Sequence, residues 1–170
     1  MFDKIGDLPL HPLVIHVVVI GIPLAVLLAL LFAFPKTRSW ARWPLGITVV
    51  GATAATYVAK QSGLAFEAAL NIKPGNPVGD LILKHSQLAE QLFWIMIAFS
   101  VIGLLNVFVV SRRTSDSTDD AVKQQPAIVR IVLPVLLVAV ALVALLWIVR
   151  VGDLGARAVW NPTSPPIFQF

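Results

Sequence analysis

Three histidines are the side chains of this sequence best suited to chemistry, because a neutral imidazole ligates haem iron and other metals. His11 and His16 lie at the start of the first long apolar run, and His85 precedes the third. Five residues correspond to about 140° of rotation on a helix, so a single helix does not readily aim His11 and His16 at one metal. Pro12 favours a non-helical His11 and loosens this restriction.

Each histidine also has a simpler interpretation. His16 lies about one turn inside the apolar run, where an ionisable residue is a functional candidate but equally suits an interhelical hydrogen bond. His85 suits a surface histidine on a solvated helix end. Glu67 and Glu90 could join His85 in a polar cluster, but the spacing matches no strong metal motif. Histidines 11, 16 and 85 are therefore weak candidates for binding haem b, and no protein-bound metal ion is expected.

Catalytic arrangements are missing from the sequence. It has no nucleophile paired with a base, no phosphate-binding loop and no paired catalytic carboxylates. The chain has no cysteine, which excludes disulfides, iron–sulfur clusters and thiolate catalysis. Asp153 and Arg157 are spaced for a local ion pair on a helix. We therefore expect that the chain is not an enzyme and has no catalytic residue.

The composition predicts an all-α integral membrane protein. Hydrophobic residues make up 58% of the 170 residues and charged residues 13%, against about 45–50% and 25% in soluble domains. A bilayer accepts such an apolar exterior. The net charge of +4 indicates loop charges near lipid headgroups rather than nucleic-acid binding, because no basic patch alternates with aromatic residues.

Four apolar runs predict a four-helix transmembrane bundle. The first contains Pro23, and the second is rich in glycine, alanine and threonine, which predicts an interior helix that packs closely. Asp80 is the expected N-cap of the third helix, whose first two turns, with His85, project into water. No internal repeat is found. The expected order is an outer segment 1–11, spans 12–34, 43–60, 88–110 and 127–149, cytoplasmic loops 35–42 and 111–126, an outer loop 61–87 with helix extensions, and an outer tail 150–170.

Basic residues give the expected orientation. Seven lie in the two shorter connections and six on the opposite side, and the first group is packed into less length. The positive-inside rule then places these connections in the cytoplasm and both termini outside. The aromatic residues fit interfaces at both ends of the spans, with Trp40 and Trp43 at one and Tyr57, Trp94 and Trp147 at the other.

The opening segment Leu8-Pro9-Leu10-His11-Pro12-Leu13-Val14-Ile15-His16 resembles that of a domain-of-unknown-function family of small bacterial four-helix membrane proteins. Gln61-Ser62-Gly63, His85 and the segment from Gly152 to Trp160 follow in the family's order. The sequence as a whole resembles members of the family from high-GC Gram-positive bacteria. This resemblance implies a multi-pass protein of the bacterial cell membrane. In the family, a histidine usually stands at the position of Asp153, and some members have an acid at that of Leu64. Since a carboxylate is a poor axial ligand for haem b, these departures imply a member that keeps the scaffold and lacks any cofactor site.

Three functions remain open. The leading hypothesis is a non-catalytic accessory subunit of a bacterial membrane complex, specifically the respiratory cytochrome bc–cytochrome c oxidase supercomplex, with lipids and other subunits as partners. The alternative is a haem- or metal-binding electron-transfer protein that uses the outer histidines. A small transporter or channel ranks last, since the threonines of the second run are the main polar groups available to line a path.

Overall fold

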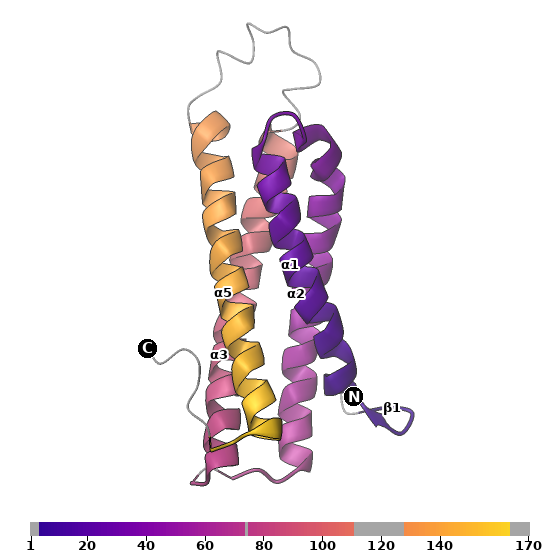
Figure 1. Ribbon diagram of the computed structural model, residues 1–170. Helices are drawn as coiled ribbons and strands as arrows, with labels where there is room; N and C mark the ends of the chain where they lie inside the picture. The colour runs from indigo at the N-terminus through magenta and orange to yellow at the C-terminus, as the bar shows by residue number, and fades with distance from the viewer. Residues whose placement is uncertain (1–3, 74, 111–127, 164–170) are drawn as a thin grey trace, which may run out of the picture.

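The protein is a bundle of four long helices in which each helix is antiparallel to its chain neighbours (Figure 1). The computed structural model describes residues 4–73, 75–110 and 128–163. A short antiparallel hairpin precedes the first helix. The elements are β1 (Lys4–Ile5), β2 (Leu8–Pro9), α1 (Leu10–Ala33), α2 (Arg38–Ala69), α3 (Pro77–Leu105) with the π-turn η1 (Asn106–Val110), and the π-turn η2 (Ile128–Val132) leading into α5 (Leu133–Trp160).

Each helix of the bundle packs against two neighbouring helices and lies diagonally across from the third. Helix α1 packs mainly against α2 and α5, and α3 packs mainly against the same two, so α1 lies diagonally across from α3. Large apolar side chains such as Phe32, Met96 and Phe99 fill the axis of the bundle and are fully buried. Many other large apolar side chains face outward, as suits a bundle surrounded by hydrocarbon.

Three helices of the described chain are long and apolar enough to cross a membrane: α1, the continuous run Pro77–Val110, and α5. Helix α2 does not join them, because glycine, alanine and threonine lower its apolar content. The predicted interior position of α2 is wrong. It occupies one corner of the bundle like the other helices, with Val49 and Thr53 buried and Ile47 and Gly51 exposed.

Several predicted helix boundaries differ from the structure. Helix α1 begins at Leu10 rather than residue 12, so His11 is helical, and α2 begins at Arg38 rather than residue 43. Helix α3 begins at Pro77 rather than Asp80, because the side chain of Asn76 accepts a 2.9 Å hydrogen bond from the Gly79 amide and caps the helix. Helix α5 continues past the predicted end at residue 149 to Trp160. The first half of the predicted tail is therefore helical. The predicted loop 111–126 and the end of the predicted tail, from residue 164, lie outside the described residues.

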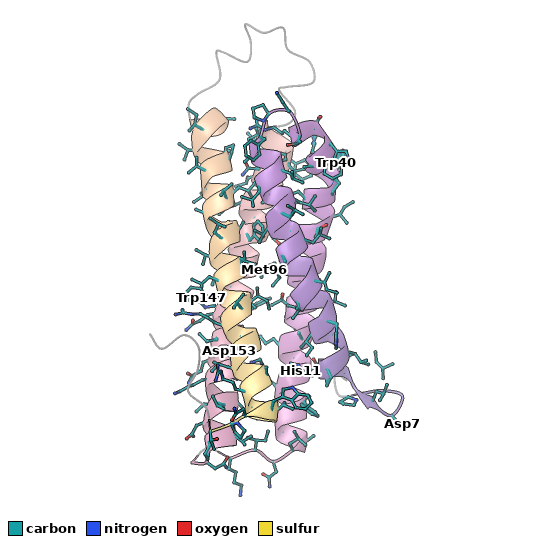
Figure 2. All side chains as sticks on the ribbon, viewed as in Figure 1. Asp7, His11, Trp40, Met96, Trp147 and Asp153 are labelled. Atoms are coloured by element: carbon teal, nitrogen blue, oxygen red, sulfur yellow. The ribbon has the colours of Figure 1, made fainter. Side chains whose placement is uncertain are left out.

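The two ends of the bundle differ in composition. Figure 2 shows His11 and Asp153 toward one end and Trp40 toward the other. We call the end where α1 and α3 begin and α2 and α5 finish the histidine end, because it contains His11 and His85. We call the opposite end, where α2 begins, the arginine end, because it contains Arg38 and Arg42.

Candidate two-histidine site

His11 and His85 meet at the histidine end, although 74 positions separate their numbers in the chain. His11 lies in the first turn of α1 and His85 in the third turn of α3, the helix diagonally opposite. Their ring centroids are 6.3 Å apart, and the ring planes are perpendicular. The fold thus brings two of the three candidate histidines together from separate helices.

The ring of His11 is held against α2. Its Nδ1 donates a 2.9 Å hydrogen bond to the backbone carbonyl of Ala59. The same ring edge lies so close to Gly63 that a Cβ added there would be 3.1 Å from both Cε1 and Nδ1. Phe66 stacks on the ring with the centroids 6.3 Å apart. Helix α2 therefore fixes both the position and the plane of the imidazole.

The ring of His85 is held against α5 in the same way. Its Nδ1 donates a 2.9 Å hydrogen bond to the carbonyl of Val151. A Cβ added at Gly155 would lie 3.1 Å from Cε1 of His85 and 3.2 Å from Nδ1. The expected surface histidine is thus a half-buried side chain that joins two helices. We call each combination of carbonyl and glycine a histidine seat.

The two seats share a four-residue spacing that has a physical reason. A helix carbonyl points toward the residue four positions later, whose side chain would flank any approaching donor. Glycine follows Ala59 and Val151 at exactly this distance, and so leaves room for an imidazole. The structure therefore contains a repeated feature in its two helical hairpins, α1–α2 and α3–α5, where the sequence predicted none.

The seats are hard to find in the sequence because the surrounding residues differ. Ala59-Lys60-Gln61-Ser62-Gly63 and Val151-Gly152-Asp153-Leu154-Gly155 share only their final glycine. The available signal is that a glycine inside an otherwise regular helix costs about 1 kcal/mol relative to alanine and so calls for a reason. Such a glycine indicates that its position has a structural role, but it does not indicate which residue of another helix packs against it.

The hydrogen bonds define the tautomer of both rings. A backbone carbonyl only accepts, so Nδ1 carries the hydrogen in each histidine. In the neutral ring, the lone pair then resides on Nε2, which has no hydrogen-bond partner within the described chain. Histidines that ligate metals commonly donate their other N–H to a backbone carbonyl in this way, which orients the ring and raises its basicity.

Stability alone gives little reason for the seats. An intramolecular hydrogen bond contributes about 0.5–1.5 kcal/mol net, and a mid-helix glycine costs about 0.5–1 kcal/mol. In each seat, the stabilisation from the hydrogen bond is nearly offset by the destabilisation from the glycine. The arrangement orients two imidazoles precisely without adding much to the free energy of unfolding.

The third histidine is not part of this site. His16 is exposed, and its Nδ1 donates a 2.7 Å hydrogen bond to the carbonyl of Pro12 within the same helix. The predicted interhelical hydrogen bond of His16 is therefore wrong. A side chain that finds its acceptor one turn back needs no partner on another helix.

The predicted polar cluster around His85 divides into separate contacts. Glu90 forms an ion pair with Lys60 and accepts a 2.9 Å hydrogen bond from the Trp94 indole. The described contacts of His85 include neither Glu90 nor Glu67. The Glu90 carboxylate therefore joins α2 to α3 and does not serve the histidine pair.

The predicted ion pair on α5 is confirmed, with Arg157 Nε 2.9 Å from Asp153 Oδ1. Both side chains are largely buried near the end of the helix, and Figure 2 shows Asp153 at the histidine end. Among the residues that the structure describes, no group of three or more histidine, cysteine, aspartate or glutamate side chains is arranged to hold a metal ion.

Comparison with known proteins gives a family for the whole bundle. No curated protein and no solved structure matches the chain. The model of a family described as predicted membrane protein (DUF2231) matches residues 7–163, which include both seats and all four helices. The family is a domain-of-unknown-function family, as the opening segment predicted. The chain therefore belongs to the DUF2231 family of predicted membrane proteins.

Proposed function

We propose that the chain holds a b-type haem between His11 and His85 and transfers electrons at one membrane surface. The observation that carries this proposal is the pair of histidine seats, which present two neutral Nε2 atoms on diagonal helices. Four-helix bundles commonly place cofactors between side chains of facing helices. The haem would supply a one-electron change between ferric and ferrous iron.

The separation of the rings supports ligation of one metal. Bond lengths of about 2.0–2.1 Å from metal to imidazole nitrogen hold two ring centroids roughly 5–6.5 Å apart, depending on the angle between the ligands. The observed 6.3 Å lies within this range. A haem brings four nitrogens of its own and needs only two axial ligands from the protein, whereas structural zinc needs four protein ligands.

Each residue of the site then has a defined role. His11 and His85 would bind the metal through Nε2. The carbonyls of Ala59 and Val151 keep the hydrogen on Nδ1 and prevent rotation of the rings. Gly63 and Gly155 allow the rings to approach these carbonyls. None of these roles needs the carboxylate of Asp153, so the difference from the family pattern at this position does not remove a ligand.

The proposal includes four membrane crossings, with the histidine end outside a bacterial cell. Along α2, Trp43 and Tyr57 are about 21 Å apart at 1.5 Å per residue, so they lie a few ångströms inside the two edges of a core about 30 Å thick, near the levels of the aromatic belts. His85 lies about 13 Å beyond Trp94. The site is then above the hydrocarbon, where a water-soluble redox partner can reach it.

The decisive experiment is spectroscopic. The chain is produced in haem-replete cells, purified in mild detergent, and examined by absorption spectroscopy with chemical oxidation and reduction, together with iron analysis. We expect a Soret band that shifts on reduction and one iron per chain. The variants His11→Ala and His85→Ala should lose the bis-histidine spectrum.

The variant His16→Ala is the matched control, because His16 lies on the same helix as His11 but outside the pair. It should keep the spectrum of the parent protein. A colourless parent protein that also fails to take up added haem contradicts the proposal. Retention of the spectrum in the double variant of His11 and His85 contradicts the assigned ligands.

A second proposal concerns a partner. We propose that the chain is a non-catalytic accessory subunit of a larger complex, specifically the cytochrome bc–cytochrome c oxidase supercomplex. The observation that favours a partner is the outer face of α2, where Gly51 and Ala54 are exposed and a Cβ at Gly51 would meet nothing within 4 Å. Small residues allow close helix packing in lipid. A haem-binding subunit and an accessory subunit are compatible roles.

This second proposal is tested by purification from native membranes. The tagged chain is isolated in mild detergent, and co-purifying proteins are quantified by mass spectrometry. Respiratory subunits in near-equal amounts are the expected result, and Gly51→Leu should reduce their yield. Recovery of the chain alone contradicts the accessory role without affecting the haem proposal.

A further inference from the structure

A cavity of about 510 Å³ opens beside the turn between α1 and α2, at the arginine end. Its lining is mainly apolar and includes the exposed residue Lys36: Leu31, Phe34, Pro35, Lys36 and Thr37. The hydroxyl of Thr37 donates to the carbonyl of Leu31 and lies 3.4 Å from that of Phe34. The cavity therefore offers apolar walls with a cation at the rim.

Two guanidinium groups are fixed next to this turn. Arg38 donates from Nε to the carbonyl of Phe32 and from Nη2 to that of Ala33, both at 3.1 Å. Arg42 donates from Nε to the carbonyl of Val107 at 3.1 Å. A guanidinium has five N–H donors, so these anchors leave donors on both arginines for another acceptor.

Among the described residues at this end, no aspartate or glutamate accompanies the basic side chains. The sequence contains no aspartate or glutamate at positions 31–47, 104–110 or 128–140, which form the described part of the arginine end. In contrast, described residues at the histidine end include Glu67, Asp80, Glu90 and Asp153. The arginine end therefore attracts anions, and the histidine end has a mixed charge.

Aromatic residues place the cavity at the level of lipid headgroups. The side chain of Trp40 is 65% exposed and that of Trp43 is 55% exposed. Exposed tryptophan is typical of the membrane–water interface. At that depth, phosphate groups and the first carbons of acyl chains are both available to the cavity.

We propose that this cavity binds an anionic phospholipid of the phosphatidylglycerol class. Lys36 and the remaining donors of Arg38 and Arg42 bind the phosphate, while Leu31 and Phe34 contact the start of an acyl chain. The apolar walls favour a lipid over soluble phosphate, because a free anion gains nothing from them. Basic pockets next to membrane helices are known to bind anionic headgroups. The proposal does not depend on the histidine site.

Brominated lipids provide the test, because bromine quenches tryptophan fluorescence at close range. A variant that keeps only Trp40, with the other four tryptophans changed to Phe, is reconstituted into vesicles of brominated phosphatidylglycerol or brominated phosphatidylcholine. We expect stronger quenching by the anionic lipid, and a loss of this preference of about fivefold in Lys36→Ala, since one cation near a membrane contributes about 1 kcal/mol.

Lys73→Ala is the control, because Lys73 lies in the turn at the opposite end. It should leave the preference at Trp40 unchanged. Equal quenching by both lipids, or a preference that survives Lys36→Ala unchanged, would overturn the proposal. Loss of the preference in inorganic phosphate but not in chloride of equal ionic strength would also overturn it, by identifying a site for soluble phosphate. If the single-tryptophan variant does not fold, native mass spectrometry of the unaltered chain and of Lys36→Ala with each lipid gives the same comparison.

Discussion

Side chains donate hydrogen bonds to backbone carbonyls at both ends of the bundle, but for different reasons. At the arginine end, Arg38 binds carbonyls in the last turn of α1, and Arg42 binds one in the π-turn η1 that follows α3. Carbonyls in the last turn of a helix have no intrahelical partner. Arg38 therefore satisfies carbonyls that the end of α1 leaves without an intrahelical partner.

At the histidine end, the acceptors already have a partner. Ala59 lies ten residues before the end of α2, and Val151 lies nine residues before the end of α5, so the helix amides four positions later serve their carbonyls. The hydrogen bonds from His11 and His85 repair no missing contact. The arginine contacts therefore follow from helix termination, whereas the histidine contacts serve the orientation of the histidines.

The largest expected effect distinguishes two glycines of α5. Gly155→Ala places a Cβ 3.1 Å from the ring of His85, so it should displace the ring and reduce haem affinity about 10- to 100-fold, as loss of an orienting contact does. Gly152→Ala meets nothing within 4 Å and should leave affinity unchanged. Haem titration of both variants measures the difference. Equal affinities would remove the functional reason for the seat.

A smaller effect should appear at the arginine end. Arg38→Ala removes charged donors from the carbonyls of Phe32 and Ala33 and should lower the free energy of unfolding by about 1.5–2 kcal/mol. Lys36→Ala, in the exposed turn two residues earlier, should change it by less than about 0.5 kcal/mol. Unfolding in mixed detergent, followed by circular dichroism, measures both. Haem affinity should be unaffected, and a loss there would mean that the two ends are not independent.

The smallest effect lies between the two ends. The Thr53 hydroxyl is 2.7 Å from that of Ser100 and donates to the carbonyl of Met96, so it joins α2 to α3 inside the bundle. Thr53→Val should lower the free energy of unfolding by about 0.6 kcal/mol, the average for such contacts in membranes. The same unfolding measurement checks it, with Thr48→Val as a half-buried control on the same helix. A loss above 2 kcal/mol would make the middle, rather than the ends, the main polar support.

Composition and apolar runs were sufficient to predict an all-α membrane protein with helices close to the observed ones, because burial in hydrocarbon demands continuous apolar segments. Helix ends were predicted less well. Asp80 and Asn76 both suit an N-cap, and the choice depends on Pro77, which starts the helix earlier. The extension of α5 to Trp160 depends on packing against α3, which local composition does not reveal.

The site was predicted in part. His11 and His85 were named as candidates from residue type alone, but nothing in the chain indicated that they meet, because their contact depends on how two hairpins pack. His16 was ranked with His11 since both lie in one motif, and the structure separates them. The seats were missed, because their key residues are a carbonyl, which every residue has, and a glycine, which has no side chain to notice.

Each histidine seat is complete within one hairpin, since α2 supplies the seat for His11 and α5 supplies that for His85. A molecule bound by both histidines would consequently link two halves that otherwise meet through helix packing and a few polar contacts, such as the Lys60–Glu90 ion pair and the Thr53–Ser100 hydrogen bond. Its binding energy adds to the cohesion of the halves and vanishes when they separate. The stability of the bundle would then depend on the bound molecule. A protein without it would unfold, and be degraded, more readily than one that has it bound.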